Sequence, residues 1–262
     1  MDDSSKLIDL INKKTKLVAM LAPSFPINYK FPEIITRLRK LGFNYVVEVS
    51  VGAKKTNEEV LEVLKNNPTS RFITSPCPSF VRLVRAKFPN LLKYLAFQAD
   101  SPMIATAKIV KEKYPEFMPV FIGPCIAKKL EASEDHPDLN ILVLNYNELD
   151  QVFAHFNILE NKEITSDNFD IEESNTRIYP FDGGLTVSAG IDKILKPEEI
   201  LIISGWKNCQ TALEQFETNL TLRFVDILFC EGGCINGPAT KKDLLIEDRK
   251  KKILEYARLR DN

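Results

Sequence analysis

The sequence predicts an α/β protein in which mostly parallel strands alternate with helices. Short apolar runs alternate with amphipathic segments along the 262 residues, which is the pattern of strand–helix–strand units. The length suits one large domain or two small lobes that share a core. Cys77, Cys125 and Cys230 each follow the end of an apolar run. In open α/β sheets the strand ends form the ligand crevice, so these positions predict a common site.

The apolar runs predict buried strands because each is short and several meet a residue that ends a strand. Residues 16–22 stop at Pro23 and residues 118–123 stop at Pro124. Proline has no backbone N–H to donate to a neighbouring strand. The predicted strands are 16–22, 45–50, 71–75, 118–123, the first part of 140–156, and 223–229.

The amphipathic segments between these runs predict helices. Residues 31–42 have apolar side chains at helical spacing, and Gly42 suits the C-terminal cap. Thr56, followed three residues later by Glu59, predicts the start of another helix. The polar, acidic stretch 159–180 is expected to form a surface excursion. The predicted helices are 31–42, 56–67, 79–95, 101–114, the second part of 140–156, 208–218 and the C-terminal segment 242–262.

Composition narrows the classes of function. The net charge is −1, so no basic surplus indicates a nucleic-acid partner. Every apolar run is far shorter than the ~20 residues of a membrane span, and the first residues lack the features of a signal peptide. The sequence therefore predicts a cytoplasmic protein without a membrane span. In that reducing compartment its five cysteines favour metal or redox chemistry over disulfides.

Four of the cysteines lie in turns built from small or rigid residues. Cys77 and Cys125 each follow a proline, and Cys230 and Cys234 bracket a Glu-Gly-Gly sequence. Cys230 and Cys234 would point the same way if a helical turn begins between them. Four thiolates in rigid loops suit a 4Fe–4S cube, although a four-cysteine zinc site and redox or structural thiols stay open as alternatives. Cys209 is interpreted as a small buried hydrophobic residue.

The three cysteine segments resemble the three signature loops of the catalytic domain of FeFe (iron-only) hydrogenases, the H-domain. They read TSPCPSFV, GPCIAKKLE and CEGGCINGP, and LAPSF, ADSPMIATA and YPFDGGL add weaker similarity in the family's order. Three motifs in order are far more specific than any one of them. The resemblance implies one H-domain over residues 1–262, without an accessory ferredoxin-like domain. It also implies two lobes, each a twisted, mostly parallel sheet flanked by helices, with a metal cluster in the cleft between them.

The resemblance further implies an H-cluster, a 4Fe–4S cube joined through a cysteine sulfur to a di-iron unit with CO, cyanide and azadithiolate ligands. Lys128 matches the family lysine that donates a hydrogen bond to a cyanide. The implied metal ligands are Cys77, Cys125, Cys230 and Cys234, the last of which also bridges to the di-iron unit. The other residues implied around the cofactor are Ala22, Pro23, Ser24, Pro102, Pro124 and Gly233.

Several positions depart from the well-known hydrogenases of this family. Pro76 stands where they carry the cysteine that relays protons, and proline cannot carry a proton. Met103, Gly123 and Leu228 replace further family residues. This pattern resembles the sensory and minimal branches of the family and predicts modest turnover, because losing a positioned proton donor commonly costs ~10²–10⁴-fold in rate.

Four glutamates are candidates for another proton relay. Glu231 is favoured because it lies between two ligand positions, so Lys128 and Glu231 are the expected catalytic residues. Glu58 and Glu59 are better explained as a solvated first helical turn. The complete set of candidates is Glu58, Glu59, Glu131 and Glu231.

The leading interpretation is a hydrogenase-like oxidoreductase that interconverts H₂ with protons and electrons. Cys209 alone is left once four cysteines bind the cube, so electrons are expected from an external carrier such as a ferredoxin. A protein that senses H₂ or redox state with the same cluster is one alternative. A non-catalytic iron–sulfur scaffold is the other, and the SPM segment and Lys128 favour a di-iron pocket over it.

Overall fold

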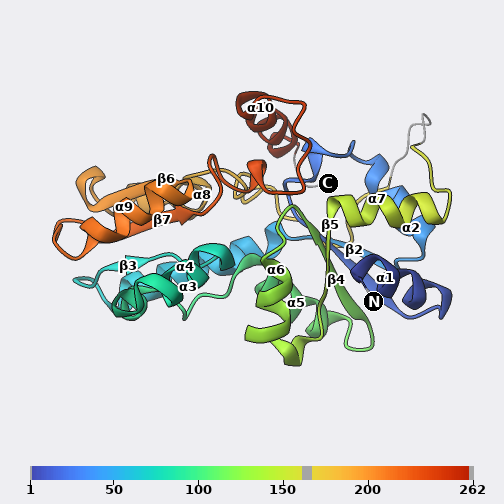
Figure 1. Cartoon of the computed structure of the whole chain (residues 1–262), viewed down its shortest axis with the longest axis horizontal. Coiled ribbons are helices and arrows are strands. Elements are labelled where there is room, and N and C mark those ends of the chain that lie inside the picture. The colour runs from blue at the N-terminus through green and yellow to red at the C-terminus, as the bar shows by residue number, and fades with distance from the viewer. Residues whose placement is uncertain (1, 161–166, 260–262) are drawn as a thin grey trace.

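The computed structural model describes residues 2–160 and 167–259. Its named strands form two separate parallel sheets, a four-stranded sheet in the order β2-β1-β4-β5 and a three-stranded sheet in the order β3-β7-β6. Figure 1 shows the first sheet on the right and the second on the left. The strands are β1 (Leu17–Leu21), β2 (Tyr45–Glu48), β3 (Phe72–Ile73), β4 (Met118–Gly123), β5 (Leu142–Asn145), β6 (Ile200–Ser204) and β7 (Phe224–Leu228). The predicted α/β class, with parallel sheets flanked by helices, is confirmed.

Helices cover both faces of the first sheet, because alternate side chains of a strand point to opposite faces. In β1, Leu17, Ala19 and Leu21 join one apolar cluster, whereas Val18 and Met20 join another. The side chains of β7 divide in the same way between two clusters. The helices are α1 (Asp3–Asn12), α2 (Glu33–Leu41), α3 (Ser50–Asn66), α4 (Pro78–Lys87), α5 (Pro102–Lys113), α6 (Lys128–Leu130), α7 (Tyr146–His155), α8 (Gly184–Ala189), α9 (Trp206–Phe216) and α10 (Ile246–Ala257).

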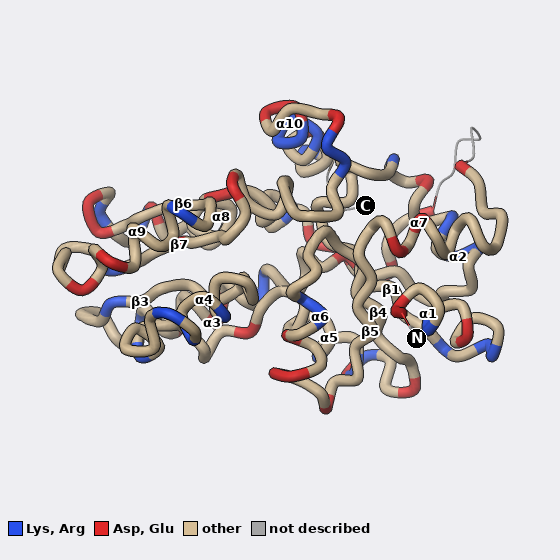
Figure 2. Tube along the Cα trace, viewed as in Figure 1, with Lys and Arg blue, Asp and Glu red and all other residues tan. Residues whose placement is uncertain are grey.

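Charged side chains are interspersed over both halves of the molecule. Figure 2 shows basic and acidic positions side by side along α10, for example, while strands β1, β4 and β5 are uncharged. No helix within residues 2–160 and 167–259 combines the length and the apolar character needed to cross a membrane. These features agree with the near-zero net charge of the sequence.

The start of α3 differs from the prediction. Thr56 was expected to cap a helix over 56–67, but α3 begins at Ser50. The Thr56 hydroxyl donates to the carbonyl of Asp100 at 2.8 Å, and Glu59 accepts from the Asp100 N–H at 2.8 Å. The two side chains that suggested a capping box therefore bind a neighbouring segment of the chain.

Two predicted helices end earlier than expected. The segment 79–95 splits into α4 and a 3₁₀ helix over Pro89–Tyr94, because proline cannot continue the preceding helix. The C-terminal helix α10 covers Ile246–Ala257, whereas residues 260–262 of the predicted helix lie outside the described residues.

The prediction of a surface excursion over 159–180 is wrong for its second half, and residues 161–166 lie outside the described residues. The Glu48 N–H donates to the Ile171 carbonyl at 2.9 Å, so the chain extends the edge of β2. Arg177 is 1% exposed and pairs at 3.1 Å with Glu48, which is fully buried. Tyr256 of α10 donates to the same carboxylate at 2.7 Å. We call residues 169–182 the connecting segment.

Replacing Arg177 with methionine should lower the free energy of unfolding by about 3–5 kcal/mol, because the Glu48 carboxylate would stay buried without its cation. Urea unfolding followed by circular dichroism measures the change. Lys13→Ala, which removes an exposed ion pair with Asp9 at 2.7 Å, is the control and should have almost no effect. Equal stability of Arg177→Met and the parent chain would contradict this role of the pair.

Candidate metal-cluster site

A pocket of about 680 Å³, counting the space at its open mouth, lies where the two sheets face each other. It is lined by the segments that follow β1, β3 and β4, by the first turn of α5, and by the connecting segment. Parallel strands place their carboxyl ends at one edge of a sheet, so these loops meet. The lining includes nine residues expected from the sequence: Ala22, Pro23, Ser24, Cys77, Pro102, Pro124, Cys125, Lys128 and Cys234.

The four expected ligand thiols gather at this pocket. Cys77, Cys125 and Cys234 line it, and Cys230 is close enough to influence the pKa of Cys77 and of Cys234. Burial raises the pKa of Cys77 to about 12, and the neighbouring thiol of Cys125 adds to the rise. Burial also raises the pKa of Cys234, with further contributions from Cys77, Cys125 and Cys230. These thiols stay protonated until positively charged metal stabilises the thiolates.

Within the described ranges, no three His, Cys, Asp or Glu side chains form a group that could hold a single metal ion. A 4Fe–4S cube takes one thiolate at each of its four irons. Three thiols in the lining of an apolar pocket, with the Cys230 thiol close enough to influence the pKa of Cys234, match the donor chemistry of such a cube.

Local backbone structure positions two of these thiols. Cys77 precedes α4, with Pro78 at the first helical position. Cys234 begins a 3₁₀ turn after Gly233, which has a φ of 93°. A Cβ on Gly233 would lie 2.6 Å from the carbonyl oxygen of Pro180. The backbone of the connecting segment therefore leaves room only for glycine at position 233.

Lys128 supplies a buried positive charge at the pocket. Its ammonium group donates to the Ser101 hydroxyl at 2.9 Å and to the Pro76 carbonyl at 3.2 Å, and it pairs with Glu131 at 2.6 Å. Lys128 is 8% exposed. Because α6 lies at the junction of the two halves (Figure 1), this side chain bridges loops from both of them.

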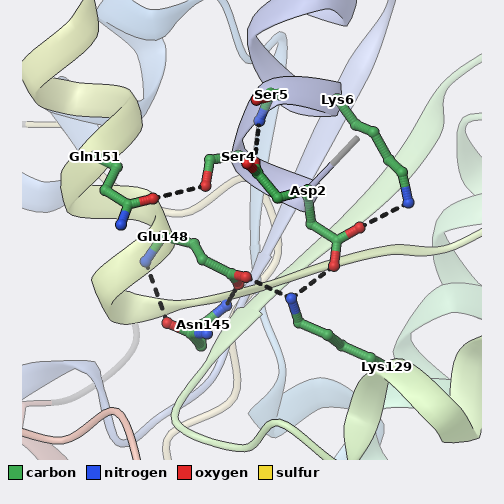
Figure 3. Close-up of polar contacts among 9 residues, drawn as sticks. Asp2, Ser4, Ser5, Lys6, Lys129, Asn145, Glu148 and Gln151 are labelled. Carbon is green, nitrogen blue, oxygen red and sulfur yellow. Dashed lines mark hydrogen bonds and ion pairs between the residues drawn. The ribbon is translucent and has the colours of Figure 1, made fainter.

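The side chain of Lys129, the next residue, points away from the pocket. Lys129 pairs with Asp3 at 2.6 Å and with Glu148, as Figure 3 shows for Glu148. Figure 3 also shows the capping box between Asn145 and Glu148 at the start of α7. Lys129 therefore links α6 to α1 and α7, whereas Lys128 lines the pocket.

The loop after β1 is held in place by hydrogen bonds on both sides. The Ala22 N–H donates to the Ile122 carbonyl at 2.9 Å, and the hydroxyls of Ser24 and Tyr146 lie 2.6 Å apart. On the opposite wall, Ser101 caps α5 and Pro102 is its first residue. These hydrogen bonds fix the positions of the loop after β1 and of the start of α5 in the absence of a ligand.

The candidate relay residues are placed outside the pocket lining. Glu231 is exposed, and its Cβ lies near Gly205 at the start of α9. Glu58 is also exposed, Glu59 binds the Asp100 N–H, and Glu131 is paired with Lys128. None of the four glutamates is among the lining residues of this pocket.

Sequence reasoning missed several lining residues, including Val49, Ala53, Tyr179 and Pro180. The YPFDGGL segment was noticed, but nothing in its letters indicates that Tyr179 faces the pocket. The departures Pro76, Met103 and Leu228 do line it. At the departure Gly123, by contrast, a Cβ would lie 2.6 Å from the Phe121 ring, so that position has room only for glycine.

Comparison with known proteins gives one family match and several distant relatives. The family described as iron only hydrogenase large subunit, C-terminal domain, matches residues 15–238. Iron hydrogenase 1 of Clostridium pasteurianum is 25% identical and aligns with 78% of this chain and 44% of its own length. The probable cytosolic Fe-S cluster assembly factor oxy-4 of Caenorhabditis elegans is also 25% identical, with 95% of this chain and 64% of its own length aligned. The chain thus spans about half the length of these curated relatives.

The fold resembles that of solved hydrogenase structures. The FeFe-hydrogenase HydA1 from Chlamydomonas reinhardtii superposes with a TM-score of 0.73 over 97% of this chain and 88% of that chain, at 17% sequence identity. A second structure, of the FeFe-hydrogenase HydA(deltaEFG), gives a TM-score of 0.74 with the same coverage and identity. The similarity covers both sheets.

Anaerobic reconstitution with iron and sulfide should give about four irons per chain, and Cys77→Ala or Cys234→Ala should lose most of that iron because each removes one ligand of a cube. Iron analysis and the visible absorption spectrum measure the loss. Cys209→Ala is the matched control, since Cys209 is not among the lining residues and its buried thiol donates to the backbone carbonyl of Leu228 at 3.4 Å. Full iron content in Cys77→Ala would contradict the assignment.

Proposed function

The chain belongs to the iron-only hydrogenase family, and from this premise we propose that it interconverts H₂ with protons and electrons at an H-cluster. The observation that carries the proposal is a single apolar pocket that combines three thiols, the buried cation of Lys128 and the loop Ala22–Ser24. A cube needs only thiolates, whereas a cation beside an apolar hollow suits anionic ligands such as cyanide. The H-cluster, when bound, supplies the redox chemistry that makes or breaks the H–H bond.

The side chains of the pocket bind and orient the cofactor, and they exclude water. In this proposal Cys77, Cys125, Cys230 and Cys234 would hold the cube, and Cys234 would also hold the di-iron unit. Lys128 would bind a cyanide ligand. Its ammonium group has three N–H donors, and Ser101, the Pro76 carbonyl and Glu131 accept from them, so a hydrogen bond to cyanide would replace one of these three.

The rest of the lining makes the pocket dry. Pro23, Pro102, Pro124 and Met103 present apolar surface, and a water-excluded site strengthens every electrostatic interaction inside it. The hydroxyl of Ser24 is hydrogen-bonded to that of Tyr146. It is the polar group that would bind the other cyanide. Gly233 takes part through its backbone conformation, which sets the position of Cys234.

Electrons are supplied or removed by an external carrier such as a ferredoxin in the cytoplasm. Cys125, Cys230 and Cys234 are half-buried, whereas Cys77 is buried, so a cube would come closest to solvent on the side of those three ligands. A carrier that docks over them would have the shortest electron path.

An iron–sulfur scaffold without H₂ chemistry is the second candidate. It is favoured by the alignment of 95% of this chain with a probable cytosolic Fe-S cluster assembly factor and by the absence of a relay thiol at Pro76. A sensor that uses the same H-cluster would share the pocket chemistry and differ from the enzyme in turnover.

Infrared spectroscopy separates these functions. After reconstitution of the cube, the chain is mixed with a synthetic di-iron complex that carries CO and cyanide. Sharp, protein-bound CO and cyanide bands together with H₂ formation from a reduced one-electron donor support the hydrogenase. Bands with H₂–D₂ exchange but negligible sustained turnover support the sensor, and the absence of bands refutes both in favour of the scaffold.

Lys128→Ala should keep the cube but bind the di-iron complex at least about tenfold more weakly, because a charge-assisted hydrogen bond to a buried anion contributes roughly 1.5–3 kcal/mol. The intensity of the CO bands measures loading, and iron content measures the cube. Lys129→Ala is the matched control, because that lysine pairs with Asp3 and Glu148 instead. Normal loading of Lys128→Ala would refute its role toward cyanide.

A further inference from the structure

We propose that β6 is the interface of a homodimer, in which it pairs antiparallel with β6 of a second copy of this chain. Strand β6 is the last strand of the second sheet and pairs with β7 alone. Figure 1 shows it above β7, at the outer edge of that sheet. We call its side away from β7 the free edge. A strand edge with unpaired backbone groups is where another strand can add to a sheet.

The other sheet edges are covered by the chain itself. The edge at β2 is extended by Ile171, and the edge at β3 is extended by Leu95. At β5, three of the four residues are buried. No residue of β6 is buried, and within the described residues no further strand or isolated bridge lies along it. The free edge of β6 is therefore the place where a partner strand fits.

The ladder between β6 and β7 shows which backbone groups face the free edge. The Gly205 N–H donates to the Leu228 carbonyl at 3.1 Å, so Gly205 faces β7. Successive residues of a strand direct their backbone N–H and C=O groups to opposite sides, so every second residue of β6 faces the same way as Gly205. The residues that face the free edge are therefore Ile200, Ile202 and Ser204.

Two of these backbone groups already have partners within the chain. The Ile200 N–H donates to the Pro197 carbonyl, and the Ser204 carbonyl accepts from the Asn208 side chain at 2.9 Å. In the part of the chain that the structure describes, no hydrogen bond reaches the Ile202 N–H, the Ile202 carbonyl, the Ile200 carbonyl or the Ser204 N–H. These groups are available to a partner strand.

The available groups match those of a second copy. In an antiparallel pair centred on Ile202, the two Ile202 residues oppose each other, and Ile200 opposes Ser204. Each Ile202 N–H then meets the other Ile202 carbonyl, and each Ser204 N–H meets an Ile200 carbonyl. The groups already bonded within the chain, the Ile200 N–H and the Ser204 carbonyl, also oppose each other, so neither needs a partner from the second copy. The free edge is therefore self-complementary.

Apolar side chains surround the free edge. Ile202 is 44% exposed, and Val187 and Trp206 are more than half exposed. Val187 lies one helical turn after Gly183, where a Cβ would be 3.2 Å from the Ile202 side chain. The strand has no charged residue and no proline, which commonly protect sheet edges from pairing. A second copy would bury this apolar surface.

Charges beside the strand favour the antiparallel orientation. Glu198 precedes β6 and Lys207 follows it, and both are exposed. Antiparallel pairing brings Glu198 of each copy near Lys207 of the other, whereas parallel pairing would bring like charges together. Lys196, which is also exposed, would face the neutral Asn208. Charge complementarity therefore selects a second copy in the antiparallel orientation.

The interface adjoins the metal-cluster site. The Ser204 hydroxyl accepts from the Gly232 N–H at 3.0 Å, and Gly232 lies between Cys230 and Cys234. Pairing that fixes β6 would therefore also fix this ligand loop. The interface is built from backbone and side chains of β6 and needs no bound cluster, so the dimer stands or falls independently of the proposed function.

Sedimentation equilibrium of the full chain over a concentration series tests the dimer. Ile202→Lys would place two ammonium groups opposite each other at the centre of the pair. Ile202→Pro would remove the N–H at that centre and keep the bonds to β7, because proline is tolerated where its nitrogen faces outward at an edge. Phe97→Lys is the matched control, since Phe97 is 49% exposed and follows Leu95 at the opposite edge of the sheet.

We expect the parent chain and Phe97→Lys to approach a mass of about 60 kDa, twice the 29.8 kDa of one chain. Both Ile202 variants should raise the dissociation constant of the dimer at least about tenfold. A parent chain that stays monomeric throughout the series, or a dimer that either Ile202 variant leaves unchanged, overturns the proposal. Parent assemblies larger than a dimer also overturn it, because the antiparallel pair uses both free edges.

Cross-linking keeps the test decisive if the Ile202 variants do not fold, which circular dichroism reports. Chains with Ile200→Cys are mixed with chains with Ser204→Cys and oxidised mildly, because residues directly opposite in an antiparallel pair have Cβ atoms about 4.5–5.5 Å apart. A disulfide that joins position 200 of one copy to position 204 of the other, located by peptide mass spectrometry, supports the dimer. Its absence from the mixture overturns the dimer.

Discussion

The structure depends on one topological constraint: two separate parallel sheets must turn their carboxyl ends toward the same space. Each loop that follows a strand can then contribute only a few residues to the pocket, which explains why the lining residues are far apart in the sequence. The connecting segment meets this constraint. One of its ends extends the edge of β2, and the other pairs with Gly233 beside Cys234. The pair of Glu48 and Arg177 fixes this segment from inside.

Charge burial explains most of the polar contacts around the pocket. Lys128 is buried next to three thiols, and its pairing with Glu131 compensates its charge before a cofactor binds. Burial raises the pKa of Cys77 and of Cys234, so these two thiols are neutral in the same state. Binding of a metal cluster by these two thiols would therefore release protons.

The sequence predicts the class of fold and the main residues of the site well, because local patterns carry that information. Apolar runs and helical spacing locate the strands, and motif order locates the cysteines. Contacts between distant segments are not encoded locally. Arg177 is buried because of Glu48, which lies 129 residues away, and Thr56 fails as a helix cap because Asp100 binds it. Tyr179 could not be placed at the pocket from its neighbours in the chain.

The position of Cys209, the fifth cysteine, bears on whether a fifth thiol can bind iron while a cluster is assembled. Cys209 lies under the loop that carries Cys230, and its thiol is directed at the Leu228 carbonyl. Burial raises the pKa of Cys209 to about 12. The pKa of Cys77 is raised equally, so what sets Cys209 apart is its place: its thiol is fully buried, directed at a backbone carbonyl, and not part of the pocket lining. In the proposed function, iron that enters the pocket would therefore not meet this fifth sulfur.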